Sequence, residues 1–369
     1  MSRNDSQPLG PKGAVTLNDV AALADVSAAT VSRAINRPDL VKPALRARIA
    51  AAIAELGYVP NGTARALASR RTKALGAVVP TFSNTIFSET VSAFQNRLDD
   101  LGYAMFLTST EYDSAREIRR VRTLVERGID GLMLVGYQHD VALYALLRER
   151  RIPFVNTWAT AEDSPYPAIG FDGRRGGEMV AEYLLSLGHR DFGIVMGDPT
   201  KSDRMQSRLQ GIRDALGRAG VALRPEQIVF TSYAVEAVRH GCAELFARGQ
   251  KPTAIIGGND ILALGSLFEC QHRGMRVPED VSIIGFGNAN IAANTIPPLS
   301  TVRTPSAEIG RSAAEYLVAL AEGEGGELPE LSELVLIPRG TTGPAPGVAL
   351  AAGQAESRRG RPRVRSTQD

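Results

Sequence analysis

The chain has 369 residues, of which 44% are apolar and 22% are charged, enough for two or three globular domains with buried cores. Its two cysteines and four histidines are too few for a disulfide framework and are not spaced as metal ligands, so we expect no metal and no cofactor. The polar segment 1–15 lacks the apolar stretch of a secretory signal, and no apolar run is long enough to span a membrane. These features predict a cytoplasmic protein without membrane contact.

The net charge of +2 is distributed unevenly along the chain. Residues 1–73 carry 11 Lys and Arg against 5 Asp and Glu, which is +6. Residues 74–343 carry 26 against 33, which is −7, and residues 344–369 carry 5 against 2, which is +3. The basic N-terminal part predicts a polyanionic partner there, because positive side chains neutralise phosphates and release counterions.

Three short helices are predicted between residues 16 and 60. Thr16 can cap the first helix, with Asp19 in its first turn, and Ser27 can cap the second. The third begins near Pro43, a favoured first-turn residue, and ends at Gly57, a natural C-terminal stop. Because a turn of about three residues separates the first two helices, this segment predicts a helix-turn-helix.

From residue 74 onward, apolar runs alternate with amphipathic segments, which is typical of a parallel α/β fold. About 270 residues and some ten strands exceed what one sheet comfortably holds, so we expect two doubly wound subdomains with a cleft between them. Ligands of such sheets bind at the carboxyl ends of the strands. The expected strands include residues 76–79, 103–107, 132–135, 153–155, 192–196, 254–256 and 281–284.

Both ends of the chain, residues 1–15 and 344–369, are predicted to be disordered, the second because it is rich in Ala, Gly, Pro and Arg. Residues 358–363 (RRGRPR) contain the Arg-Gly-Arg-Pro core of AT-hook peptides, which thread arginines along narrow minor grooves. Because so short a motif arises easily by chance, we expect a solvated basic tail, with an auxiliary DNA contact as the alternative.

Residues 17–36 (LNDVAALADVSAATVSRAIN) closely resemble the headpiece of the lactose/galactose repressor family. The resemblance covers about residues 16–343, and within the family the segments 80–84 and 268–271 look most like gluconate-type repressors. Further matching segments are 53–61 (IAELGYVPN), 64–67 (ARAL), 186–190 (SLGHR), 258–260 (GND) and 296–302 (IPPLSTV).

The resemblance implies a sequence-specific transcription regulator, most often a repressor, that binds a palindromic operator as a homodimer and responds to a sugar or sugar-acid effector. It implies a DNA-binding headpiece over residues 16–60, a hinge helix and linker over 61–73, and a periplasmic-binding-protein-like core over 74–343. Within the core, the N-subdomain is expected at 74–172 and 299–329, and the C-subdomain at 173–298 and 330–343.

Two other functions are disfavoured by the residues themselves. A periplasmic sugar-binding protein would share the core but would need a signal peptide and would have no use for a basic headpiece. An enzyme would need a catalytic motif, and we find no Walker-type loop, no nucleophile elbow and no metal cluster. We therefore expect a regulator and not an enzyme.

The resemblance places Ala28 and Ala29 where relatives read base edges, although alanine can only touch a thymine methyl and is otherwise merely a good helix former. Arg33, one turn further on, can hold guanine O6 and N7 in a fork, or it is simply solvated. Small hydrogen-bonding residues suited to phosphate contacts are Thr16, Ser27, Thr30, Ser32 and Asn36.

The hinge segment contributes three further residues to the expected DNA interface: Asn61, Arg65 and Leu67. By resemblance the segment forms a helix only on DNA, and Leu67 wedges into the minor groove and kinks it. The alternative is an interdomain linker in which Leu67 packs on its own protein.

Family positions indicate eight effector-binding residues around the cleft: Phe82, Asn84, Phe87, Trp158, Arg208, Asn259, Asp260 and Asn288. Trp158, the only tryptophan, suits the apolar face of a sugar ring but is equally consistent with core packing. Arg208 offers a fork of donors to a carboxylate or to hydroxyls, unless an internal salt bridge occupies it.

Three positions depart from the family pattern. Asp25 replaces a turn glycine, and Lys42 replaces a serine cap of the third helix. Gly287 stands where many members of the family place an effector-binding aspartate, so we expect Arg208 to lack that acidic neighbour. A buried cation without a partner favours an anionic ligand, with a sugar acid such as gluconate as first candidate and a neutral sugar as second.

Overall fold

The computed structural model describes residues 15–59, 71–82, 85–158, 160, 166–329, 331 and 333–348. The chain divides into two compact units, Met1–Lys73 and Ala74–Asp369, so the division falls where the predicted linker ends and the core begins. The predicted site residues Asn61, Arg65, Leu67 and Asn84 lie outside the described residues, as does the Arg-Gly-Arg-Pro segment.

The headpiece contains the three predicted helices, α1 (Leu17–Leu23), α2 (Ala28–Asn36) and α3 (Pro43–Leu56), with a 3-10 turn at Pro38–Leu40. Thr16 and Asp19 cap α1 reciprocally, since the Asp19 carboxylate accepts from the Thr16 amide at 2.8 Å and the Thr16 hydroxyl accepts from the Asp19 amide at 3.4 Å. These hydrogen bonds lower the pKa of Asp19. The Ser27 hydroxyl accepts from the Thr30 amide at 3.2 Å at the start of α2.

The two family departures in the headpiece have visible backbone consequences. Asp25 adopts φ 49°, the left-handed conformation that the usual glycine would supply. Lys42 precedes α3 without a side-chain cap, as expected for a lysine in place of serine. Gly57 ends α3 at φ 60°.

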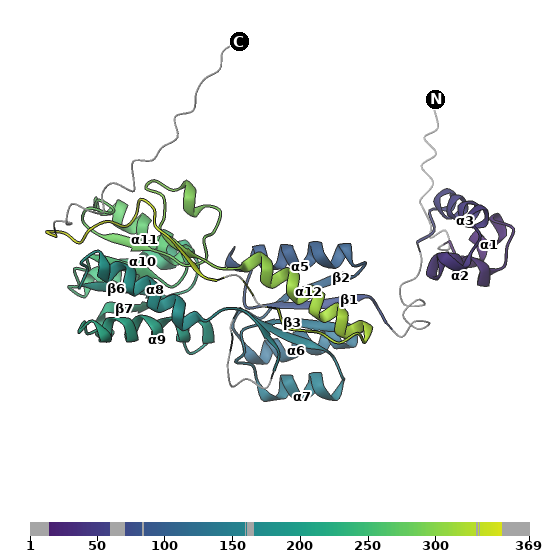
Figure 1. The fold of residues 1–369 in the computed structure, drawn as a ribbon, viewed down its shortest axis with the longest axis horizontal. Helices are drawn as coiled ribbons and strands as arrows, with labels where there is room; N and C mark the ends of the chain where they lie inside the picture. Colours follow the sequence, from purple (N-terminus) through teal and green to yellow (C-terminus); the bar gives the residue numbers. More distant parts are fainter. Residues whose placement is uncertain are drawn as a thin grey trace, which may run out of the picture. The chain divides into compact units, whose positions relative to one another are not determined.

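The first sheet of the core is parallel, with strand order β2-β1-β3-β4-β5. Helices α5 (Ser88–Asp100) and α12 (Ser306–Glu322) cover one face, and α6 (Ser114–Glu126) and α7 (Val141–Glu149) cover the other (Figure 1). Its strands are β1 (Ala74–Val79), β2 (Ala104–Ser109), β3 (Gly131–Val135), β4 (Phe154–Thr157) and β5 (Ala168–Ile169).

The second sheet repeats this arrangement with strand order β7-β6-β8-β9. Alternate residues of β8 face opposite ways: Ile256 packs into the cluster that contains α8 and α9, and Ile255 into the cluster that contains α10 and α11. The elements are α8 (Gly173–Ser186), β6 (Phe192–Met196), α9 (Asp203–Arg218), β7 (Ile228–Phe230), α10 (Val235–Ala247), β8 (Ala254–Gly257), α11 (Asp260–His272) and β9 (Ser282–Ile284). The predicted pair of doubly wound subdomains is confirmed.

Short elements complete the core: the strands β10 (Thr301–Arg303) and β11 (Val335–Ile337) and 3-10 turns at Thr85–Phe87, Pro225–Gln227 and Ala292–Asn294. β10 follows the edge of the second sheet, where the Gly285 and Gly287 amides donate to the Ser300 and Val302 carbonyls. Residues 299–303 therefore belong with the C-subdomain, which corrects the predicted boundary at 299. The hydrogen bonds to the segment that follows β9 hold them there.

The predicted disordered tail also begins too early. Ala345 is buried and its amide donates to the Leu187 carbonyl at 2.9 Å, and Val348 packs over Gly188. Residues 344–348 are therefore part of the core, because these small and apolar side chains cover the end of α8.

No helix in the described part of the chain is long and apolar enough to cross a membrane.

Two glycines bring α8 and α9 into backbone contact. A Cβ at Gly177 would overlap the Arg208 carbonyl, and one at Gly211 would overlap the Arg174 carbonyl. The crossing therefore accepts no side chain at either position. It fixes the position of α9, the helix that carries Arg208.

Candidate functional site

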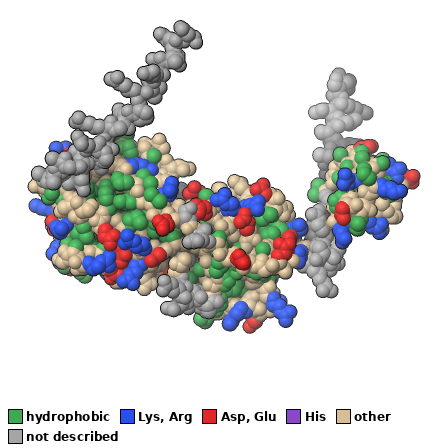
Figure 2. All heavy atoms as spheres, in the orientation of Figure 1, with side chains coloured by type: hydrophobic (Ala, Val, Ile, Leu, Met, Phe, Trp, Pro, Cys, Tyr) green, Lys and Arg blue, Asp and Glu red, His purple; other side chains and the backbone are tan. Residues whose placement is uncertain are grey.

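The second headpiece helix separates a buried face from a polar exposed face. Val31 and Ala34 are buried, whereas Ala29, Arg33 and Asn36 are exposed. Arg33 forms no ion pair with any residue that the structure describes, so its guanidinium is free to bind a ligand. Figure 2 shows further Lys and Arg side chains on the visible face of this unit.

Of the remaining predicted phosphate contacts, Thr16 caps α1, and the others lie on α2 or cap it. Ser27 is exposed and its hydroxyl lies 2.9 Å from that of Thr30, and the Asn36 amide donates to the Ser32 hydroxyl at 3.3 Å. Ala28 is half-buried. These weak local hydrogen bonds orient small polar groups and can be exchanged for phosphate oxygens.

In the core, a salt-bridged pair at the start of α9 connects the two subdomains across the cleft. The Asp203 carboxylate accepts from the Tyr137 and Gln138 amides of the opposite subdomain, at 2.5 and 3.2 Å. The same carboxylate pairs with Arg204 at 2.8 Å. Gly136 permits this approach, because a Cβ there would overlap the Arg204 guanidinium.

The inner end of the cleft brings together three of the predicted effector residues, Phe87, Trp158 and Arg208. The Phe87 and Trp158 rings meet edge to face with centroids 5.4 Å apart. Trp158 is buried at φ 68°, a conformation that is costly for a large side chain and is typical of functional sites. The space enclosed by this inner cavity is only about 10 Å³.

Arg208 is a buried cation that makes no salt bridge with any described residue. Its Nη1 donates to the Gly258 carbonyl at 2.5 Å, and its guanidinium lies 3.5 Å from the Phe286 ring centroid. Its Nε has no hydrogen-bond partner, and neither does Nε1 of the neighbouring Trp158. Burial lowers the pKa of Arg208 to about 9, which still leaves the side chain charged at neutral pH.

Asp260, the acid that was expected as a possible internal partner, is engaged elsewhere. Its carboxylate accepts from the Thr301 hydroxyl at 2.5 Å and from the Ala289 amide at 2.6 Å. Burial raises the pKa of Asp260. The internal salt bridge with Arg208 is therefore not formed.

The other predicted effector residues, Asn259, Asp260 and Asn288, line a separate cavity of about 340 Å³. Gly287 has φ 128° and lies against the side chain of Ile86. An aspartate at this position would therefore be strained. Phe82 is 59% exposed and is not among the residues that line these two cavities. The seven predicted effector residues that the structure describes thus do not line one common cavity.

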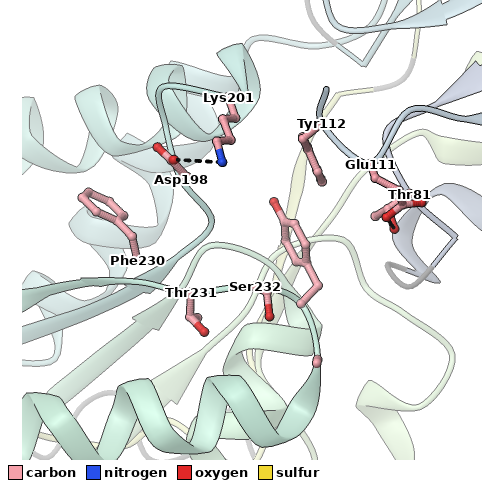
Figure 3. Close-up of a pocket in the computed structure, with 10 residues that line it drawn as sticks. Thr81, Glu111, Tyr112, Asp198, Lys201, Phe230, Thr231 and Ser232 are labelled. Carbon is pink, nitrogen blue, oxygen red and sulfur yellow. Dashed lines mark hydrogen bonds and ion pairs between the residues drawn. The ribbon is translucent and has the colours of Figure 1, made fainter. Parts of the chain in front are cut away.

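A more spacious cavity, the outer cavity, has a volume of about 490 Å³ and was not predicted (Figure 3). Thr81, Glu111 and Tyr112 contribute from one subdomain. The other subdomain supplies Asp198, Lys201, Phe230, Thr231, Ser232, Tyr233 and Ala234. Tyr112 and Tyr233 stack with centroids 5.7 Å apart and line both this cavity and the inner one.

Two residues of the outer cavity stand at sequence positions that can indicate a ligand site. Tyr112 and Tyr233 each follow the carboxyl end of a strand, the edge at which doubly wound sheets bind ligands. The strand before Tyr233 has only three residues, Ile228–Phe230, too few for a periodic pattern. Among the described residues, no cluster of three or more His, Cys, Asp or Glu side chains is placed to hold a metal.

Comparisons with known proteins agree with the two-part architecture. The family model "Bacterial regulatory proteins, lacI family" matches residues 16–61, and "Periplasmic binding protein-like domain" matches residues 181–342. The HTH-type transcriptional regulator DegA of Bacillus subtilis is 34% identical over 298 residues, which cover 80% of this chain and 88% of DegA. The chain belongs to the lacI family.

Solved structures of lacI-family regulators have the same fold. The lac repressor dimer bound to operator is 27% identical, with a TM-score of 0.77 over 90% of this chain and all of that one. The complex of the transcriptional regulator CelR with cellobiose is 30% identical, with a TM-score of 0.66 over 89% of this chain and 99% of that one.

Family membership establishes the general function. The protein is a DNA-binding transcription regulator of a repressor family, not an enzyme. The predicted partners are those seen in this family, in which the lac repressor is a dimer bound to operator and CelR is solved with cellobiose. As a regulator of bacterial genes it acts in the cytoplasm.

Proposed function

We propose that the effector is a small polyhydroxylated acid whose carboxylate pairs with Arg208, and that its binding changes the affinity of the headpiece for operator DNA. The observation that carries this proposal is the buried Arg208 side chain, which has an unpartnered Nε and no salt bridge among the described residues. A buried cation is costly unless a partner compensates it. A ligand carboxylate would supply both the charge and the acceptor.

The neighbouring charges compensate Arg208 only in part, because the charge of Asp260 raises the pKa of Arg208 and that of Arg204 lowers it. Asp203 pairs with Arg204, and Asp260 is held by Thr301 and the Ala289 amide. With Gly287 in the usual aspartate position, no further carboxylate enters the cleft from that loop. The inner cleft is therefore locally cationic and suits an anion.

The groups around Arg208 suit the rest of a sugar acid. The Trp158 Nε1 is a second buried donor without a partner, and it can bind a hydroxyl or the second carboxylate oxygen. The rings of Trp158 and Phe87 present apolar surfaces to the carbon skeleton. Ser202, which also lines this space, adds a hydroxyl.

Ligand entry requires the walls of the cleft to move, because a space of about 10 Å³ holds at most one water molecule. The Asp203 hydrogen bonds to the Tyr137 and Gln138 amides are the contacts that such a movement would change. An effector that favours one cleft state over the other then alters operator affinity, as linkage requires.

Calorimetric titration of the full-length protein tests the charge of the effector directly. The ligands are gluconate, galactonate, glucuronate and galacturonate, each beside its neutral parent sugar. We expect at least one acid to bind about tenfold or more tightly than its parent, since a charge-assisted hydrogen bond is about twice as strong as a neutral one. A neutral sugar that binds more tightly than every acid would overturn the proposal.

On the DNA side, we propose that Arg33 reads a guanine and that Thr16, Ser27, Thr30, Ser32 and Asn36 contact phosphates. Support comes from the exposure of Arg33 and from the position of these small residues on and beside α2. Ala28 and Ala29 then face bases without a hydrogen bond. The roles of Asn61, Arg65 and Leu67 stay predictions from the sequence, as does association with the nucleoid in the DNA-bound state.

A further inference from the structure

The outer cavity has the size of a ligand site, whereas the inner one does not. Its volume of about 490 Å³ falls within the range of roughly 300–1,000 Å³ that is usual for small-molecule pockets. It lies at the carboxyl ends of β2, β6 and β7, between the two subdomains. None of the seven predicted effector residues that the structure describes lines it.

Aromatic rings form part of its wall. Phe230 lines the cavity and is 50% exposed, so part of its ring is accessible to a ligand. Figure 3 shows Phe230 on one side of the cavity and Tyr112 on the other. Such apolar faces suit the carbon-bound hydrogens of a sugar ring.

The polar groups of the cavity are hydroxyls, which both donate and accept, together with two carboxylates and one ammonium. Glu111 accepts from the Thr81 and Ser109 hydroxyls at 2.7 and 2.9 Å, and its carboxylate has lone pairs to spare. Asp198 lies 4.0 Å from the Lys201 ammonium. Two carboxylates and one ammonium leave this cavity acidic, so it suits neutral hydroxyl groups and disfavours a second anion.

We propose that the outer cavity is a second carbohydrate subsite, which takes one neutral pyranose ring, and that the effector is therefore an acid of two linked sugar units. The acid end rests on the function proposed above. Because Tyr112 and Tyr233 line both cavities, a ligand with its carboxylate at Arg208 and its second ring outside passes beside this tyrosine pair.

The backbone holds both tyrosines in place. Glu111 and Tyr112 are consecutive residues in the left-handed region, at φ 54° and 57°, a costly arrangement that is typical of functional loops. On the opposite side, the Tyr233 hydroxyl lies so close to Gly197 that a Cβ there would overlap it. An alanine at position 197 would therefore displace the hydroxyl end of Tyr233, because the atoms nearest to the new Cβ all belong to that side chain.

The test is calorimetry on the full-length protein with gluconate and with three gluconates that carry one extra hexose: cellobionate, maltobionate and lactobionate. We expect at least one of the three to bind about tenfold more tightly than gluconate. Phe230→Ala should reduce the ratio of these two affinities towards one and leave gluconate binding unchanged, whereas Gly197→Ala, which displaces Tyr233 of both cavities, should weaken the binding of both kinds of ligand. Phe268→Ala, which removes another exposed phenylalanine of the same subdomain, should leave the ratio intact.

The neutral disaccharides cellobiose, maltose and lactose separate the two proposals. If they bind as tightly as their acids, and more tightly than glucose, the second subsite stands and the acid proposal fails. If none of the three acids binds more tightly than gluconate, or if Phe230→Ala leaves the ratio as it is in the wild type, the second subsite is wrong. Thermal unfolding of each variant confirms that it is folded.

Discussion

Two arginines on two helices show how differently the headpiece and the core can recognise an anion. Arg33 on α2 is exposed, so its charge is hydrated, and in its proposed role it would exchange water and counterions for DNA. Arg208 on α9 is buried beside Phe286 and Trp158, so its charge is already desolvated before a ligand arrives. In the roles proposed here, the headpiece would recognise DNA through its surface, and the core would recognise its effector through a buried cation.

The largest expected change in stability comes from substitutions at the crossing of α8 and α9, which positions Arg208. Gly211→Ala places a Cβ on the Arg174 carbonyl, and we expect it to destabilise the core by about 3 kcal/mol and to weaken effector binding. Gly217→Ala on the same helix meets nothing within 4 Å and should stabilise by up to about 1 kcal/mol. Denaturant unfolding measures both, and equal stabilities would mean that the crossing is looser than described.

In the headpiece, Arg33→Ala should cost about 1–3 kcal/mol on operator DNA and relax the preference at one base pair of each half-site. Arg33→Lys keeps the charge but loses the fork, so it should keep most non-specific affinity and still lose the base preference. Quantitative gel shifts with operator and scrambled DNA compare the three proteins. Unchanged discrimination in both variants would remove Arg33 from base reading.

Salt should affect the two ligands differently. Operator affinity should fall steeply as salt rises, because each phosphate contact contributes about 0.9 to the log-log slope. Effector affinity should change little, because a buried ion pair is screened far less than an exposed one. Titrations of both ligands between roughly 50 and 200 mM salt give the two slopes, and equal slopes would argue against a buried carboxylate site.

The smallest expected effect is on the pH dependence of stability and concerns His189. This side chain is buried against Thr253, Ser282 and the Gly343 carbonyl. Burial lowers its pKa, so the unfolded chain binds a proton more readily than the folded one. Its contribution to stability is therefore complete above the unfolded pKa of about 6.5 and is lost as the pH falls below that value.

Unfolding measured from pH 7 to 5 tests this effect. His189→Gln should flatten the fall in stability over this range, whereas His240→Gln, at an exposed histidine, should keep the wild-type slope. A slope that His189→Gln leaves unchanged would assign the acid sensitivity to other groups.

The headpiece was predictable because its structure is local. The Thr16 and Ser27 caps, the Gly57 stop and the left-handed Asp25 depend on a few neighbouring residues. The core strands were predictable where they are long and buried. In contrast, β7 and β10 have three residues each, and residues 344–348 are fixed by contacts with the end of α8 that no periodicity reports.

The site was predictable only in part for the same reason. Family positions indicated Phe87, Trp158 and Arg208, which do meet at the inner cleft. The sequence could not show that Asp260 is engaged by Thr301, or that Tyr112 and Tyr233 stack across the cleft from distant segments. Such pairings follow from tertiary packing and cannot be inferred from residue type and spacing.

The role of Arg208 is tested most directly by a thermodynamic cycle, with the tightest-binding acid and its neutral counterpart as ligands. Arg208→Met should lower the affinity for the acid by about 2–5 kcal/mol and change the affinity for the neutral sugar little. Arg213→Met, which removes an exposed arginine from the same helix, should behave as the wild type with both ligands. If Arg208→Met binds the acid as tightly as the wild type does, Arg208 is not the partner of an effector carboxylate and the central claim is wrong.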